Sequence, residues 1–104
     1  MQIDELSILP VDVRAEQSVV GAILLDPAIL DEVRMFLPTP DAFFDDAMRA
    51  IYGAMLVLAD AGKSIETVIL ADAVRKVLLE NENVPDLLAR LADNAITSAF
   101  VTVT

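Results

Sequence analysis

The sequence contains no cysteine and no histidine among its 104 residues. These absences exclude disulfide bonds, thiolate chemistry, Cys/His zinc sites and acid–base catalysis by imidazole. An enzyme built from this chain would depend on carboxylates, hydroxyls, a few cations and Tyr52, which is its one tyrosine. No set of such residues forms a known catalytic or cofactor motif. We therefore expect no catalytic residue, no cofactor and no metal site, and no enzymatic activity for this chain.

Basic residues are also scarce. Lysine and arginine together number 7 against 17 aspartates and glutamates, which gives a net charge of −10. Phosphate binding relies on clustered lysine and arginine, whereas the basic residues here are scattered along the chain. We expect no direct binding of nucleic acid and a function that is carried out through other proteins.

Long apolar runs are missing as well. The longest apolar stretch, residues 50–59, is much shorter than the roughly 20 residues that span a bilayer. The first nine residues carry two acidic side chains where a secretory signal would have a basic start and an apolar block. A cytoplasmic location without membrane contact is the expectation.

Apolar residues are nevertheless abundant, at 56% of the chain, and few of them are aromatic. They recur at spacings of three and four residues, which is typical of helices packed on one face. We predict a single all-α domain over residues 10–99, a compact orthogonal bundle of about five or six helices, after a flexible lead-in at residues 1–9. The excess of apolar residues also favours a surface that a partner covers.

Capping residues predict where helices begin and end. Asp12, Asp26 and Asp45 are candidate N-caps, and Pro27 fits the first helical position after Asp26. Gly62 is placed to end a helix in a left-handed conformation.

Local patterns predict the remaining segments. A helix is expected over residues 67–79 and a loop over residues 80–83. The alternating, β-branched residues 99–104 should be extended or frayed. Residues 41–44 should form a short turn that places both phenylalanines in the core. The predicted apolar stripes include Phe36 and Val68.

Residues 10–21 read Pro-Val-Asp-Val-Arg-Ala-Glu-Gln-Ser-Val-Val-Gly. This run resembles the opening helix of the N-terminal domain of the DnaB-type bacterial replicative DNA helicases, which typically has Glu-Ala-Glu-Gln-Ser-Val-Leu-Gly after a proline. Further similar runs follow in the family's order. They are Ile-Leu-Leu-Asp at 23–26, Asp-Ala-Phe-Phe at 41–44, Ile-Tyr-Gly-Ala-Met at 51–55, Gly-Lys-Ser-Ile-Glu-Thr at 62–67 and Leu-Leu-Ala-Arg-Leu at 87–91.

The resemblance implies a non-catalytic assembly and partner-binding domain in DNA replication. Such a head takes part in ring formation through self-association and contacts primase or a helicase loader. A full-length parent would be an ATP-dependent helicase, and residues 100–104 would begin the hairpin or linker that follows the head.

Departures from the family pattern favour a divergent member. Ala47 replaces a frequent histidine, Ile69 a frequent threonine and Glu66 an aspartate, and the Gly-Gly usual near Pro85 is missing. An alternative is a stand-alone regulator that resembles the helicase head, of phage or mobile-element origin, and competes for primase or loader. The sequence beyond Thr104 would separate the two. A third hypothesis, an acidic mimic of DNA, fits the charge but not the apolar composition.

Met35, Phe36, Tyr52 and Met55 are the candidate partner-binding residues. Methionine repacks easily against different partners, and Met35 falls off the main stripe of its helix. Helical spacing also fits Tyr52 and Met55 to an ordinary core role.

Four residues of the family-like run and its end form a structural motif: Glu16, Gln17, Gly21 and Asp26. Glu16 either interacts favourably with the helix dipole in the first turn or bonds across to a neighbouring loop or helix. Gln17 is either a surface residue or part of the same contact. Gly21 costs about 1 kcal/mol of helix propensity, so we expect another helix to approach it closely.

Two other patterns have ordinary structural explanations. Gly62-Lys63-Ser64 lacks the earlier glycine of a phosphate-binding loop, since Val57 occupies that position. The acidic pairs at 31–32 and 45–46 are interpreted as solvated faces or caps and not as metal sites.

Overall fold

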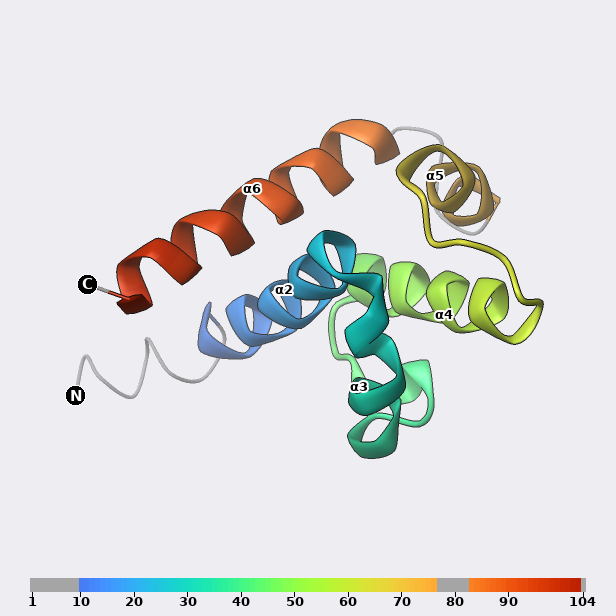
Figure 1. Cartoon of the computed structure of the whole chain (residues 1–104), viewed down its shortest axis with the longest axis horizontal. Helices are drawn as coiled ribbons and strands as arrows, with labels where there is room; N and C mark the ends of the chain where they lie inside the picture. The colour runs from blue at the N-terminus through green and yellow to red at the C-terminus, as the bar shows by residue number, and fades with distance from the viewer. Residues whose placement is uncertain (1–9, 77–82, 104) are drawn as a thin grey trace.

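The computed structural model describes residues 10–76 and 83–103, with side chains placed for residues 13–76 and 83–96. These residues form five α-helices, two short 3-10 helices and no strand, which confirms the predicted all-α single domain (Figure 1). The elements in chain order are α2 (Pro10–Leu25), η1 (Pro27–Ile29), α3 (Leu30–Phe36), η2 (Pro40–Ala42), α4 (Asp46–Asp60), α5 (Thr67–Arg75) and α6 (Val84–Val103). None of the described helices has a stretch that is both long and apolar enough to cross a membrane.

The core is built around one face of α4, and every other α-helix contributes to it. α4 supplies seven buried side chains at helical spacing, among them Met48, Ile51 and Leu58. The partners from the other helices are Val20, Ile23, Leu30, Leu70, Ala71, Val74, Val84, Leu88 and Leu91. Full burial of a side chain of this size contributes about 1.5–3 kcal/mol, so this aliphatic core is the main source of stability.

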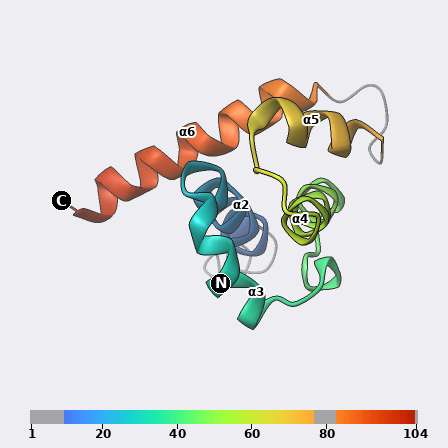
Figure 2. The same ribbon diagram turned by 45° about the vertical axis from the view of Figure 1, so that its right-hand side comes forward.

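α6 runs in the opposite direction to α2 and packs along it (Figures 1 and 2). Gly21 lies buried at their closest approach. A Cβ atom at this position would lie 2.5 Å from the backbone oxygen of Leu91 and 3.0 Å from the Cβ of Ala95. No side chain fits there, so the close approach expected at Gly21 is confirmed.

Two of the three predicted N-caps are confirmed. Asp26 accepts a hydrogen bond from the N–H of Ala28 at 3.3 Å, and the Asp45 carboxylate accepts one from the N–H of Met48 at 3.1 Å. The prediction for Asp12 was wrong, because α2 already includes Pro10 and Asp12 lies inside the helix. Proline suits a first turn, where its missing N–H would have had no intrahelical acceptor.

The C-terminal segment differs from the sequence-based expectation. Residues 99–103 continue α6 and are neither extended nor frayed. The described part of the chain contains no strand with which this segment could pair, and the helix satisfies its backbone hydrogen bonds internally. β-branched residues lower helix propensity only slightly, so this requirement decides the conformation.

Four further predictions need correction or lie outside the described residues. α5 ends at Arg75. The residues described do not include the expected helical residues 77–79, the loop residues 80–82 or the lead-in at 1–9. Phe43 is buried as predicted, whereas Phe44 is 69% exposed. Successive side chains in an extended segment point to opposite sides, and Phe43 has extended φ and ψ values, so both rings could not enter the core.

Candidate partner-binding surface

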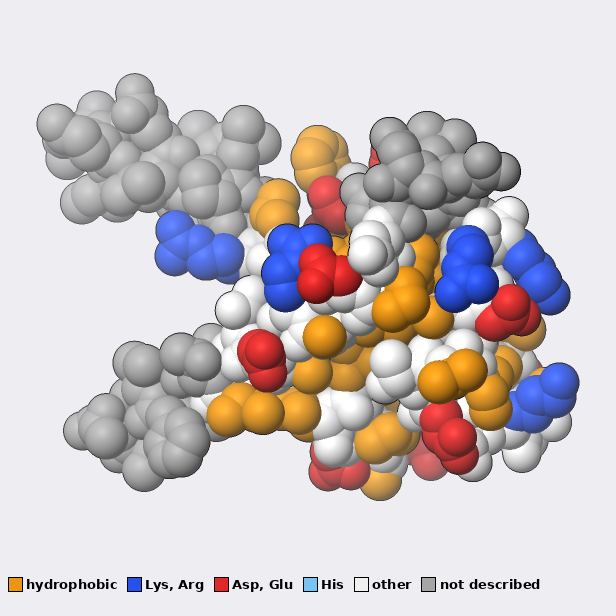
Figure 3. Space-filling model, turned by 90° about the horizontal axis from the view of Figure 1, so that it is seen from above, with side chains coloured by type: hydrophobic (Ala, Val, Ile, Leu, Met, Phe, Trp, Pro, Cys, Tyr) orange, Lys and Arg blue, Asp and Glu red, His pale blue; other side chains and the backbone are white. Residues whose placement is uncertain are grey.

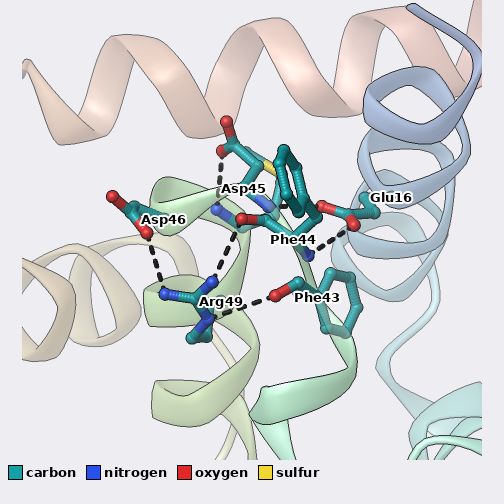
Figure 4. Close-up of polar contacts among 7 residues, drawn as sticks. Glu16, Phe43, Phe44, Asp45, Asp46 and Arg49 are labelled. Atoms are coloured by element: carbon teal, nitrogen blue, oxygen red, sulfur yellow. Dashed lines mark hydrogen bonds and ion pairs between the residues drawn. The ribbon is translucent and has the colours of Figure 1, made fainter. Parts of the chain in front are cut away.

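The start of α4 is held to α2 through Glu16. Its carboxylate accepts hydrogen bonds from the backbone N–H of Phe44 at 2.6 Å and of Asp45 at 3.0 Å (Figure 4). These two residues directly precede α4, where backbone N–H groups have no intrahelical acceptor and a negative charge is favourable. Glu16 therefore bonds across to a neighbouring segment, which is the second of the two roles considered for it.

Arg49 holds the same segment from the opposite side. Its guanidinium donates from Nε to the carbonyl of Phe43 at 3.1 Å and from Nη2 to the carbonyl of Phe44 at 3.0 Å. A third bond joins Nη1 to the carboxylate of Asp46 at 2.8 Å. The backbone of Phe44 is thus fixed through both its N–H and its C=O, while its ring remains exposed (Figure 4).

The other members of the predicted structural motif have simpler surroundings. Gly21 lies in the α2–α6 contact and Asp26 caps η1. Gln17 is half-buried on α2 next to Glu16 in sequence. Two motif residues therefore connect α2 to other parts of the domain. Glu16 bonds to the segment directly before α4, and Gly21 lies against α6.

Tyr52 and Met55 have no exposed surface. The Tyr52 ring lies against Phe43, with 4.8 Å between the ring centroids, and its hydroxyl donates a hydrogen bond to the carbonyl of Leu37. The prediction that these two side chains bind a partner was wrong, because neither can be reached in the folded domain. They occupy the buried stripe of α4, where their helical spacing also placed them.

Burial raises the pKa of the Tyr52 hydroxyl above its ordinary value of 10.0, and the positive charge of Arg34 partly opposes this shift. Because the folded state holds the proton more tightly than the unfolded state, stability is retained below pH 10 and falls as the pH rises above it. Tyr52→Phe should remove this alkaline loss and cost about 1 kcal/mol at neutral pH through the lost hydrogen bond. Ultraviolet titration of this one tyrosine, with denaturant unfolding of both proteins, provides the measurement. A tyrosinate transition at the ordinary pH would contradict the prediction.

Met35 and Phe36 are both on the surface, at the end of α3, with exposed fractions of 77% and 82%. Asp31 and Glu32 are also exposed on this short helix. We call these four residues the outer face of α3. The other large apolar side chains exposed in the described part of the chain are Leu25, Phe44, Val57, Val68, Ile69 and Ile96.

The connections of α3 to the rest of the domain hold this face in place. Arg34 forms an ion pair with Asp60 of α4 at 2.9 Å, and Leu30 is buried in the core. The carbonyl of Leu37, directly after α3, accepts the hydrogen bond from Tyr52. α3 is therefore fixed at its beginning, middle and end.

The turn after α4 is occupied by its own capping bonds. Gly62 has φ 74°, its N–H donates to the carbonyl of Ala59 at 3.0 Å, and the N–H of Lys63 donates to that of Leu58 at 2.9 Å. These are the two bonds of a Schellman motif. Both N–H groups are engaged and cannot cradle a phosphate, which agrees with the structural interpretation of Gly62-Lys63-Ser64.

A pocket of about 440 Å³ adjoins this turn. It is lined by Pro27, Ala28, Leu30, Asp31, Ala59, Lys63, Ser64, Ile65 and Glu66. Its charged side chains carry both signs, and the described residues contain no group of acidic side chains arranged to hold a metal ion. On the face shown in Figure 3, basic side chains are likewise interspersed with acidic and apolar ones. This distribution does not suit phosphate binding.

Residues 8–103 match the family described as the DnaB-like helicase N-terminal domain. The chain belongs to this family. It is 37% identical over 93 residues to the replicative DNA helicase DnaB of Geobacillus stearothermophilus, and 35% identical over 93 residues to the replicative DNA helicase DnaC of Bacillus subtilis. A DnaB protein of Buchnera aphidicola is 35% identical over 94 residues.

These matches cover 88–89% of this chain but only 20% of each relative. The chain therefore spans about a fifth of the length of these helicases and corresponds to their DnaB-like N-terminal domain. The resemblance noted from the run at residues 10–21 is confirmed.

Proposed function

We propose that this chain is the non-catalytic assembly and partner-binding domain of a replicative DNA helicase. In this role it takes part in ring formation and contacts primase or a helicase loader during DNA replication. The family match over nearly the whole chain carries the replication role. The exposure of Met35 and Phe36 on a fixed helix supports the binding role.

In the proposed mechanism, the domain recruits a partner protein through a surface that is already ordered before the partner binds. A partner that binds a preorganised face pays less conformational entropy than one that binds a mobile loop. The Arg34–Asp60 ion pair and the Tyr52 hydrogen bond keep α3 in place before any partner arrives. Large apolar side chains that become desolvated in a contact typically supply most of its affinity.

Replacing both anchors tests this role. The double variant Met35→Ser, Phe36→Ser should bind purified primase or loader more than tenfold more weakly, because each anchor that is buried on binding is worth about 1–2 kcal/mol. Both side chains are exposed, so the free energy of unfolding should change by about 0.5 kcal/mol or less. Biolayer interferometry with the immobilised chain measures the binding.

The matched control is Val57→Ser, Val68→Ser, which removes two exposed apolar side chains from α4 and α5. This variant should keep wild-type affinity. Equal losses for the two double variants would mean that binding follows general surface hydrophobicity and not α3. If wild-type protein binds neither primase nor loader, the proposed partner role is wrong.

A further inference from the structure

We propose that the outer face of α3 binds a basic, amphipathic segment of a partner protein. Apolar side chains of the segment would pack on Met35 and Phe36, and its lysines or arginines would lie beside Asp31 and Glu32. This inference deepens the proposed function and rests on it, since it names the chemistry of the partner at the same surface.

The spacing of the four residues places unlike groups side by side. Asp31 and Met35 are four positions apart, as are Glu32 and Phe36, and side chains at this spacing are neighbours on a helix. The face therefore has two carboxylates over its first turn and two large apolar groups over its last. A complementary ligand has apolar anchors at one end and cations about one helical turn away.

The carboxylates of Asp31 and Glu32 are not neutralised by an ion pair within the described part of the chain. Arg34, the one cation on α3, is turned to Asp60, with 2.9 Å between the charged groups. Among the described residues, no lysine or arginine forms an ion pair with Asp31 or Glu32. In a chain with a net charge of −10, this face attracts a cationic ligand and repels nucleic acid and anionic lipid.

Charge also disfavours a second copy of this chain as the occupant. A twofold contact through one patch brings the same residues of both subunits together. Asp31 and Glu32 would then face their own copies, and like charges placed together in an interface cost free energy. A basic segment has the opposite effect, because each cation is steered to an available carboxylate.

The surroundings leave room for an extended ligand. Asp31 belongs both to the outer face of α3 and to the lining of the pocket of about 440 Å³, which also contains the carboxylate of Glu66 and the cation of Lys63. A segment that lies along α3 can therefore continue past Asp31 into a recess.

The test uses the 104-residue chain labelled with ¹⁵N and a synthetic helical peptide with one leucine face and one lysine face. Amide chemical shifts should move at residues 30–37, and the affinity should fall as salt screens the charges. Asp31→Asn, Glu32→Gln should weaken binding about fivefold, since two exposed charge contacts are lost. Met35→Ser, Phe36→Ser should weaken it more than tenfold.

The charge control is Asp72→Asn, Asp86→Asn. It changes the net charge of the chain by the same amount as the Asp31/Glu32 variant, but at positions on α5 and α6, and it should leave the affinity unchanged. Equal weakening by both charge variants would overturn the inference, as would equal binding of a peptide that carries glutamate in place of lysine. Loss of self-association in Met35→Ser, Phe36→Ser would instead assign the face to a second copy. If that variant loses primase or loader while the Asp31/Glu32 variant keeps it, the proposed function stands and the basic chemistry is wrong.

Discussion

Gly21→Ala should lower the free energy of unfolding by about 2 kcal/mol, which corresponds to a fall in Tm of about 10 °C for a domain of this size. The new methyl group would lie 2.5 Å from the Leu91 carbonyl oxygen, a backbone atom that cannot move without shifting α6. Overpacking of this kind costs about 3 kcal/mol and is offset by about 1 kcal/mol of helix propensity. Thermal and urea unfolding measure the change.

Gly53→Ala is the matched control, because it makes the same substitution inside α4. A Cβ at Gly53 would lie 3.2 Å from the Pro40 ring, which is a side chain near the surface and can yield slightly. The propensity gain of about 1 kcal/mol should balance this contact, so stability should stay within about 0.5 kcal/mol of the original. If Gly21→Ala also stays within about 0.5 kcal/mol of the original stability, the α2–α6 contact is looser than the structure shows.

The fold was largely predictable because its signals are local. The Asp26 and Asp45 caps and the left-handed Gly62 each act within a few residues of their position. The apolar stripe of α4 runs from Met48 to Leu58, about three helical turns, and a stripe of that length identifies a buried face. Even the closeness of another helix to Gly21 followed from the cost of glycine in a helix.

The surface was harder to predict, since short elements carry too little pattern. α3 has seven residues, so Phe36 fitted its apolar stripe as well as Val33 did, yet Phe36 is 82% exposed. Tyr52 was assigned to a partner surface on its residue type, although its spacing already indicated the core. For Phe36 the packing of neighbouring elements decides the outcome, and a helix as short as α3 does not encode it.

Long-range polar contacts had almost no signal in the sequence. Glu16 lies 28 residues from Phe44, and nothing local shows which turn faces it. Arg49 was missed, although one clue existed: a cation near the beginning of a helix is disfavoured by the helix dipole. Its bonds to the Phe43 and Phe44 carbonyls explain why an arginine lies there.

Glu16→Ala should destabilise the domain by about 2 kcal/mol. The substitution removes two hydrogen bonds to a carboxylate and a negative charge beside the start of α4. The loss is smaller than the sum of these contributions because water can reach the exposed N–H of Phe44. Urea unfolding gives the free energy, and amide hydrogen exchange at Phe44 and Asp45 reports on the two bonds directly.

Two variants separate the bonds from the charge. Glu16→Gln keeps one oxygen acceptor on a side chain of the same length, so it should cost about half as much and protect one of the two amides. Glu32→Ala removes an equal charge from the surface of α3 and should be nearly neutral. Equal effects of Glu16→Ala and Glu32→Ala would show that α4 does not depend on this contact. Faster exchange confined to Phe44 and Asp45, with α6 unaffected, would establish that Glu16 acts at the α2–α4 junction and not through the whole bundle.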